Sequence, residues 1–163
     1  GKVIEEENTP GEIMIKGPQV FSEYWGKPEV TKESFIDGWF KSGDVAILEK
    51  GYFKILGRDS VDIIKSGAYK ISALEIEDTL LKHPSIKECA VVGIEDNKWG
   101  EIVAVSIIIS ERNEDLSLED LKKWSMDFLS DYKIPRKINI VSELPKNSMG
   151  KINKPEVKKS FLT

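Results

Sequence analysis

The chain has 163 residues, of which 40% are hydrophobic, and it carries 24 Lys or Arg against 28 Asp or Glu for a net charge of −4. This length and apolar content can build one domain, or a small domain together with part of another. An acidic chain lacks the broad basic surface that nucleic-acid binding requires, and with no run of 18 apolar residues we expect no transmembrane segment.

Two residues that often mark chemistry occur once each, Cys89 and His83. A lone cysteine cannot form an internal disulfide, and the two residues together provide too few ligands for a zinc centre. A single histidine is also poor support for a Ser-His-Asp hydrolase. We therefore predict no metal site, and we interpret Cys89 as a buried thiol and His83 as a helix-terminal imidazole.

The first 57 residues predict a small, mainly β piece. Alternation around Ile13 and Ile15 predicts a strand over residues 12–17, and residues 28–34 predict a short helix that begins at a proline. The next candidate is Gly43-Asp44, which we interpret as a turn that presents a carboxylate.

A hairpin is the clearest signal in this first part. Residues 45–48 and 52–56 predict its two strands, and Gly51 between them supplies the positive φ that such a turn needs.

From Gly57 onward the pattern changes to longer alternating elements, so the candidate domain boundary lies between residues 57 and 58. Strands over 61–65 and 69–71 flank a tight turn at Ser66-Gly67-Ala68, for whose glycine no packing role is expected.

A capping box, in which Ser72 accepts a hydrogen bond from the first turn and Glu75 reaches back, predicts a helix to about residue 82. Leu74, Leu80 and Leu81 are expected on its core side.

Later elements complete a small α+β domain over 58–163, without an internal repeat. Val- and Ile-rich strands are predicted over 86–94 and 102–109, and Ser117 caps a helix that ends near residue 129. A strand over 137–141 and a helix over 154–161 follow.

Lys151 is the strongest candidate for a functional side chain. Gly150 precedes it, and Asn147-Ser148 favours a turn through local hydrogen bonds, so Lys151 is predicted at the tip or exit of a tight loop. Its ammonium can neutralise phosphate oxygens as a point charge. Residues 133–163 contain eight Lys or Arg and two Glu, which suits a small phosphorylated ligand, although a solvated basic loop would have the same composition.

Five segments, taken in order, resemble the C-terminal part of the adenylate-forming acyl-CoA synthetase (AMP-binding) superfamily. They are residues 17–31, 39–44, 57–67, 129–135 and 144–151. The resemblance implies that Asp44 binds the ribose hydroxyls of ATP or AMP and that Arg58 contacts ribose and phosphate. It also implies that Lys151 stabilises the transition state in which a carboxylate attacks the α-phosphate.

The same resemblance implies a second step in which the C-terminal domain rotates. Asp59 or Ser60 would be the hinge, and Ser66, Gly67 and Ala68 would line the path by which CoA reaches the acyl-adenylate. One residue more than in many relatives separates Arg58 from Gly67, so the choice of hinge residue stays open.

The resemblance also sets expectations for cofactors and partners. ATP, CoA and a small carboxylic acid would bind, with Mg²⁺ held alongside ATP mostly by residues outside this chain. Residues 1–57 would be the end of a large N-terminal domain and 58–163 a mobile cap, so the chain would be an incomplete enzyme. The compartment stays open between mitochondrial and cytoplasmic.

Within the superfamily, the malonate-CoA ligase branch, which includes acyl-CoA synthetase family member 3, is the most similar in sequence over residues 60–67, 72–77 and 146–154. A medium- or long-chain fatty acid-CoA ligase is the alternative enzyme, and a non-catalytic interaction module derived from this domain is the alternative of another class.

Overall fold

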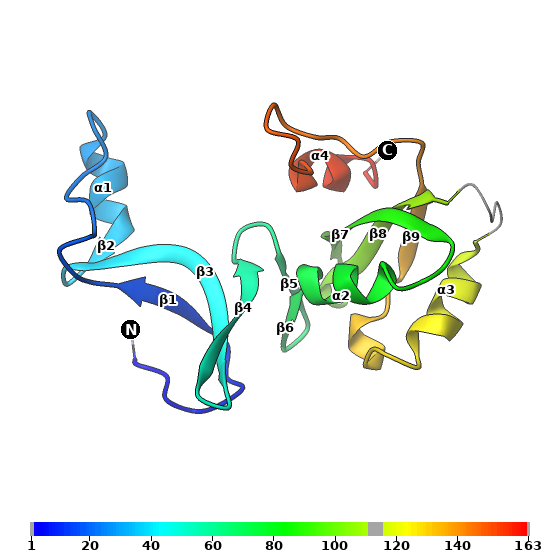
Figure 1. Ribbon diagram of the computed structural model, residues 1–163, viewed down its shortest axis with the longest axis horizontal. Coiled ribbons are helices and arrows are strands. Elements are labelled where there is room, and N and C mark those ends of the chain that lie inside the picture. The colour runs from blue at the N-terminus through cyan, green and yellow to red at the C-terminus, as the bar shows by residue number, and fades with distance from the viewer. Residues whose placement is uncertain (1, 111–115, 163) are drawn as a thin grey trace. The chain divides into compact units, whose positions relative to one another are not determined.

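The computed structural model describes residues 2–110 and 116–162 and has two compact units, Gly1–Ser60 and Val61–Thr163 (Figure 1). Both units combine strands and helices, in agreement with the predicted α+β class. Within the described residues, no helix is long and apolar enough to cross a membrane.

The first unit is an antiparallel sheet built around one long strand, β3 (Trp39–Glu49), with which all three other strands pair. These partners are β1 (Gly11–Ile15), β2 (Phe35–Ile36) and β4 (Tyr52–Arg58). Helix α1 (Pro28–Ser34) starts at the expected proline. The predicted β piece, short helix and hairpin are therefore present.

The connection between β3 and β4 is a two-residue turn. Lys50 and Gly51 have φ values of 51° and 80°, as a primed hairpin turn requires, so Lys50 also adopts the conformation expected only of Gly51. The interpretation of Gly43-Asp44 as a turn was wrong. Both residues lie inside β3, where Gly43 has φ of 76° and the register with β1 shifts, so that Lys41 and Val45 pair with Met14 and Glu12. The local glycine signal marks a β-bulge there.

The second unit contains a five-stranded mixed sheet with a long antiparallel hairpin, whose second strand pairs with three of the other strands. The hairpin strands are β7 (Ile86–Asp96) and β8 (Gly100–Ile109). The sheet order is β6-β5-β8-β7, with β9 (Lys137–Ile140) parallel to β8. The glycine turn joins the remaining two strands, β5 (Ile63–Ser66) and β6 (Tyr69–Ser72).

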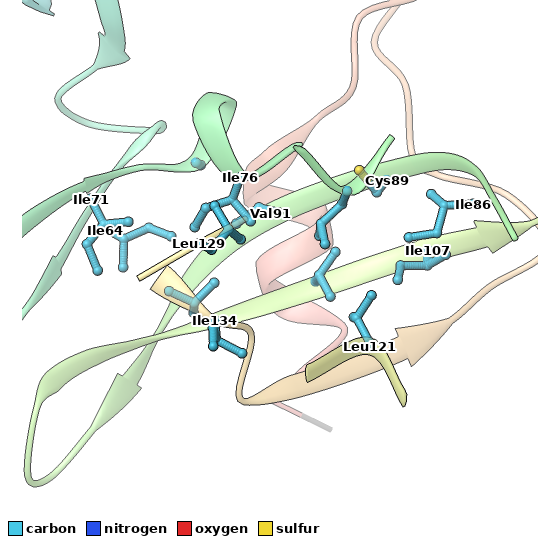
Figure 2. Close-up of a cluster of buried hydrophobic side chains, with 14 of the residues drawn as sticks. Ile64, Ile71, Ile76, Ile86, Cys89, Val91, Ile107, Leu121, Leu129 and Ile134 are labelled. Carbon is cyan, nitrogen blue, oxygen red and sulfur yellow. The ribbon is translucent and has the colours of Figure 1, made fainter. Parts of the chain in front are cut away.

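Both faces of this hairpin are buried, which explains the continuous apolar runs in its sequence. Val91 and Val105 belong to one cluster, drawn in Figure 2, which also contains residues of α2 (Ala73–Leu80) and α3 (Leu118–Ser125). Ala90 and Ala104, one position away in each strand, belong to a second cluster, which contains Val157 of α4 (Lys154–Lys159). A short 3₁₀ helix, η1 (Asp131–Lys133), precedes β9.

The predicted N-caps of α2 and α3 are confirmed. In each, the serine side chain accepts a hydrogen bond from a backbone N–H in the first turn of its own helix. Ser72 Oγ accepts from the Glu75 N–H at 3.2 Å, and Ser117 Oγ accepts from the Asp120 N–H at 3.1 Å. Both helices are shorter than predicted.

The prediction of which residues of α2 face the core was wrong for two leucines. Leu74 and Leu81 are 37% and 48% exposed, whereas Ala73, Ile76 and Leu80 are buried.

Cys89 and His83 both make contacts within the second unit that are typical of structural residues. Cys89 in β7 is buried, and burial raises the pKa of its thiol to about 12. His83 follows α2, where its Nδ1 accepts from the Ser85 N–H and its ring packs edge-on against Trp124. Burial lowers the pKa of this imidazole. Among the described residues, no cluster of three His, Cys, Asp or Glu could hold a metal ion.

Candidate functional site

Asp44 and Arg58 lie opposite each other on β3 and β4 of the first unit. The two side chains form an ion pair with the Arg58 Nε 3.1 Å from Asp44 Oδ1, and both reach solvent. The bulge positions this pair: the Gly43 N–H donates to Glu12 Oε1, and a Cβ on Gly43 would lie 3.4 Å from Arg58 Nη1. An exposed ion pair contributes little to stability, so the fold itself gives no strong reason for this pair. The sequence predicted both residues but not their direct contact.

The segment after β4 contains the two candidate hinge residues. The Asp59 N–H donates to the Gly43 carbonyl at 3.0 Å, which attaches Asp59 to the strand pair. Ser60 is the last residue of the first compact unit, and Val61 begins the second. The division of the chain into domains at 57/58, and hinge motion at Asp59 or Ser60, remain predictions.

The glycine turn has packing that the sequence did not reveal. Gly67 has φ of 58°, and its N–H donates to the Trp99 carbonyl at 2.7 Å. A Cβ on Gly67 would lie 3.4 Å from Cε3 of the Trp99 ring. Ser66 is buried and pairs with Gly100, while Ala68 is exposed. The expectation that Gly67 has no packing role was therefore wrong, because the β7–β8 turn contacts it.

Trp99 and Arg136 are additions to the candidate site around this glycine. The Arg136 guanidinium lies 4.9 Å from the centre of the Trp99 ring, a cation–π distance. Asp96 Oδ1 accepts from the Lys98 and Trp99 N–H groups and so sets the turn that carries the indole. That Asx-turn signature was readable in the sequence, but its contact with Gly67 was not.

Lys151 lies in an exposed loop that Asn147 organises. The side-chain Oδ1 of Asn147 accepts from the N–H groups of Met149 and Lys151, at 2.9 and 3.0 Å. Its backbone N–H donates to the Lys151 carbonyl, and its carbonyl accepts from the N–H of Gly150, whose φ is 78°. Lys146 and Ile152 form a β-bridge at the base of the loop. The Lys151 ammonium is thus carried at the end of a tight turn and faces solvent.

The candidate residues fall into two groups. Asp44 and Arg58 belong to the first unit, and the Ser66–Ala68 turn and Lys151 belong to the second. Within the second unit, the glycine turn and the lysine loop are separate structures with different neighbours.

Comparison with known families agrees with this geometry. Residues 75–151 match the family described as the AMP-binding enzyme C-terminal domain. The chain belongs to the adenylate-forming, AMP-binding enzyme superfamily.

Its relatives include CoA ligases. A malonate–CoA ligase of Arabidopsis thaliana is 52% identical over 175 residues, covering 98% of this chain and 29% of that protein. A mitochondrial malonate–CoA ligase of Mus musculus is 49% identical over 156 residues, covering 95% of this chain and 27% of that protein. The chain thus spans less than a third of the length of these relatives.

Solved structures give the same fold. The o-succinylbenzoate CoA synthetase of Bacillus subtilis, in complex with an acyl-adenylate intermediate, has a TM-score of 0.82 and 35% identity over 94% of this chain and 31% of its own. The ATP-bound MatB of Rhodopseudomonas palustris has a TM-score of 0.83 and 31% identity over 96% of this chain and 31% of its own.

Proposed function

We propose that this chain is the C-terminal part of an ATP-dependent acid–CoA ligase that acts on malonate. The observation that carries the proposal is the 52% identity with a malonate–CoA ligase over 98% of the chain. The surface geometry supports it, because a solvent-facing lysine on a preformed turn and a carboxylate–guanidinium pair are groups that bind phosphate and ribose.

In the first half-reaction, an oxygen of the acid's carboxylate attacks the α-phosphorus of ATP. The bond to the β-phosphate breaks, and pyrophosphate leaves. Lys151 neutralises the charge that develops on the α-phosphate oxygens, and the turn that carries it is already formed. Asp44 accepts hydrogen bonds from the ribose hydroxyls, while Arg58 holds Asp44 in place and contacts ribose and phosphate. Mg²⁺ would supply further charge neutralisation beside ATP, through ligands that precede this chain in the full-length enzyme.

In the second half-reaction, the CoA thiolate attacks the acyl carbonyl, and AMP leaves as the acyl–phosphate bond breaks. The part of the chain that follows the hinge at Asp59 or Ser60 rotates, and the Ser66–Ala68 turn lines the pantetheine path. Ser60 is the better hinge candidate, because the Asp59 amide is bonded within the first unit and Ser60 ends that unit. A proline at Ser60, which fixes φ, should slow thioester formation more than adenylation.

The acid is tested by pyrophosphate exchange in the full-length enzyme with malonate, octanoate and palmitate. Malonate is expected to exceed both fatty acids in kcat/KM by about a hundredfold. A pocket built to bind the second carboxylate of malonate would leave its own polar group buried and unpaired when a fatty acid binds, which weakens binding strongly. Preference for a fatty acid would replace malonate with the alternative substrate class. Absence of exchange with all three acids, in an enzyme that binds ATP, would favour the interaction module.

A further inference from the structure

A buried lysine, Lys154, joins two carboxylates in the second unit. Its Nζ lies 2.7 Å from Asp62 Oδ1 and 2.9 Å from Glu77 Oε1. The exposed fractions of the three side chains are 9%, 15% and 13% respectively. Glu77 Oε1 also accepts from the Val91 N–H at 2.7 Å. Burial raises the pKa of Glu77, and the positive charge of Lys154 opposes this rise.

Stability alone is a weak explanation for such a cluster. Desolvation of buried charges offsets much of their attraction, and well-packed apolar residues often stabilise a fold equally well. The charged cluster does fix the relative positions of its three segments, because ion pairs and hydrogen bonds hold their partners at set distances and angles.

The cluster connects segments that the proposed mechanism uses. Lys154 is the first residue of α4 and comes three residues after Lys151. Asp62 comes two residues after Ser60, and its carbonyl accepts from the Ala73 N–H at the start of α2. Glu77 lies on α2 itself. The end of the lysine loop is thereby attached to the segment that follows the hinge, 92 residues earlier in the chain.

The lysine loop depends on its ends for its position. Its middle is held by the bonds of Asn147, and a Cβ on Gly150 would meet nothing within 4 Å. At the first end, Lys146 pairs with Glu88 at 2.9 Å, but both side chains are more than a third exposed. At the second end, Lys154 is buried, so this attachment is screened less by solvent and salt.

We propose that Lys154, held by Asp62 and Glu77, is a positioning residue that fixes the Lys151 loop to the segment beyond the hinge. It touches no substrate. The loop then moves with the rotating domain without changing its own conformation. This inference rests on the proposed role of Lys151 in adenylate formation.

The first test measures the loop directly in the full-length enzyme by amide hydrogen exchange. Lys154→Met, which keeps side-chain length and removes the charge, is expected to speed exchange in residues 146–151 about tenfold while 102–109 in β8 stay unchanged. Lys154→Arg should restore most of the protection. Lys159→Met is the matched control, because Lys159 lies on the same helix in an exposed pair with Glu156. Unchanged loop exchange in Lys154→Met would overturn the inference.

If Lys154→Met prevents folding, a second variant keeps the test open. Lys154→Met combined with Asp62→Asn and Glu77→Gln removes all the buried charges of the cluster together, so no charged group is left unpaired. The same faster loop exchange is expected in the combined variant. Equal loop protection in it and in the parent enzyme would contradict the inference.

The second test separates the half-reactions. Lys154→Met is expected to slow pyrophosphate exchange about tenfold with little change in the KM for ATP, and to leave CoA transfer from supplied acyl-adenylate within about twofold. An equal fall in both half-reactions, with faster amide exchange throughout the unit, would make Lys154 a general structural residue and overturn the inference. Lys151→Ala belongs in the same assay: if it leaves pyrophosphate exchange intact, the proposed function of Lys151 fails, while the loop amides still decide the role of Lys154.

Discussion

The glycine turn and the lysine loop of the second unit each depend on a glycine with positive φ, but they differ in what holds them in place. Gly67 and Gly150 have φ values of 58° and 78°, a conformation that costs other residues energy. The Gly67 turn is bonded to the Trp99 carbonyl and lies against its ring, so it is part of the sheet's own packing. The Gly150 turn has no such neighbour and is ordered by Asn147 and by its two ends.

This difference suits the two proposed tasks. A surface that a flexible pantetheine arm passes needs a fixed shape, which a turn packed on a sheet provides. A charge that is delivered to a phosphate and later withdrawn needs to project from its domain, which an open loop with a solvent-facing lysine allows. The predictions below test whether the two turns serve different half-reactions, from the largest expected effect to the smallest.

Lys151→Ala in the full-length enzyme should slow pyrophosphate exchange by about a hundredfold or more, the scale of losing one preorganised electrostatic group. Thioester formation from supplied acyl-adenylate should be largely spared. Exchange at the parent rate would remove Lys151 from the chemistry. Lys159→Ala, which deletes a positive charge on the neighbouring helix, is the control.

Asp44→Ala tests a residue outside both turns. Loss of a charged hydrogen bond to ribose should weaken the binding of ATP by roughly 1.5–3 kcal/mol. The KM for ATP should rise accordingly, with little change in the KM for CoA. Glu49→Ala is the matched control, because Glu49 lies on the same strand and pairs with Lys54 on β4. If Asp44→Ala leaves the ATP dependence unchanged, its carboxylate has only a structural role beside Arg58.

Gly67→Leu should slow CoA transfer by about tenfold, because a side chain there meets Trp99 and narrows the proposed path, while pyrophosphate exchange continues. Gly67→Ala should have a smaller effect, and its partial relief by Trp99→Ala would show how much of it comes from the ring contact. The two-turn mechanism is wrong if Gly67→Leu and Lys151→Ala both abolish pyrophosphate exchange and both leave CoA transfer intact.

Gly150→Ala should give the smallest effect. No atom within 4 Å obstructs the new methyl group, so only the backbone strain of a positive φ remains, about 1–2 kcal/mol and partly relieved because the loop can adjust. Pyrophosphate exchange should fall by no more than about tenfold. Gly26→Ala is the control, since Gly26 in the first unit also has positive φ and open space. A loss as large as that of Lys151→Ala would mean that the loop requires its own fixed shape.

Local signals in the sequence predicted much of this fold. The Ser72 and Ser117 caps, the proline start of α1 and the Lys50-Gly51 hairpin all depend on residues within a few positions of one another. The apolar runs of β7 and β8 predicted two strands of one sheet, because β-branched residues favour strands, and the structure pairs them with each other. The same kind of evidence failed for Leu74 and Leu81, because the face of α2 that is buried is chosen by the sheet beneath it and not by the helix alone.

The sequence by itself determined the α+β class, the order of the elements, the family resemblance and the candidate residues Asp44, Arg58, Gly67 and Lys151. Each of these is a property of composition, short periodicity or residue order. The tertiary structure alone decided that Gly43 makes a bulge against β1, that Trp99 lies against Gly67, and that Lys154 is buried between Asp62 and Glu77. Those contacts join residues 27 or more positions apart, and no short-range pattern specifies which distant side chains a folded sheet brings together.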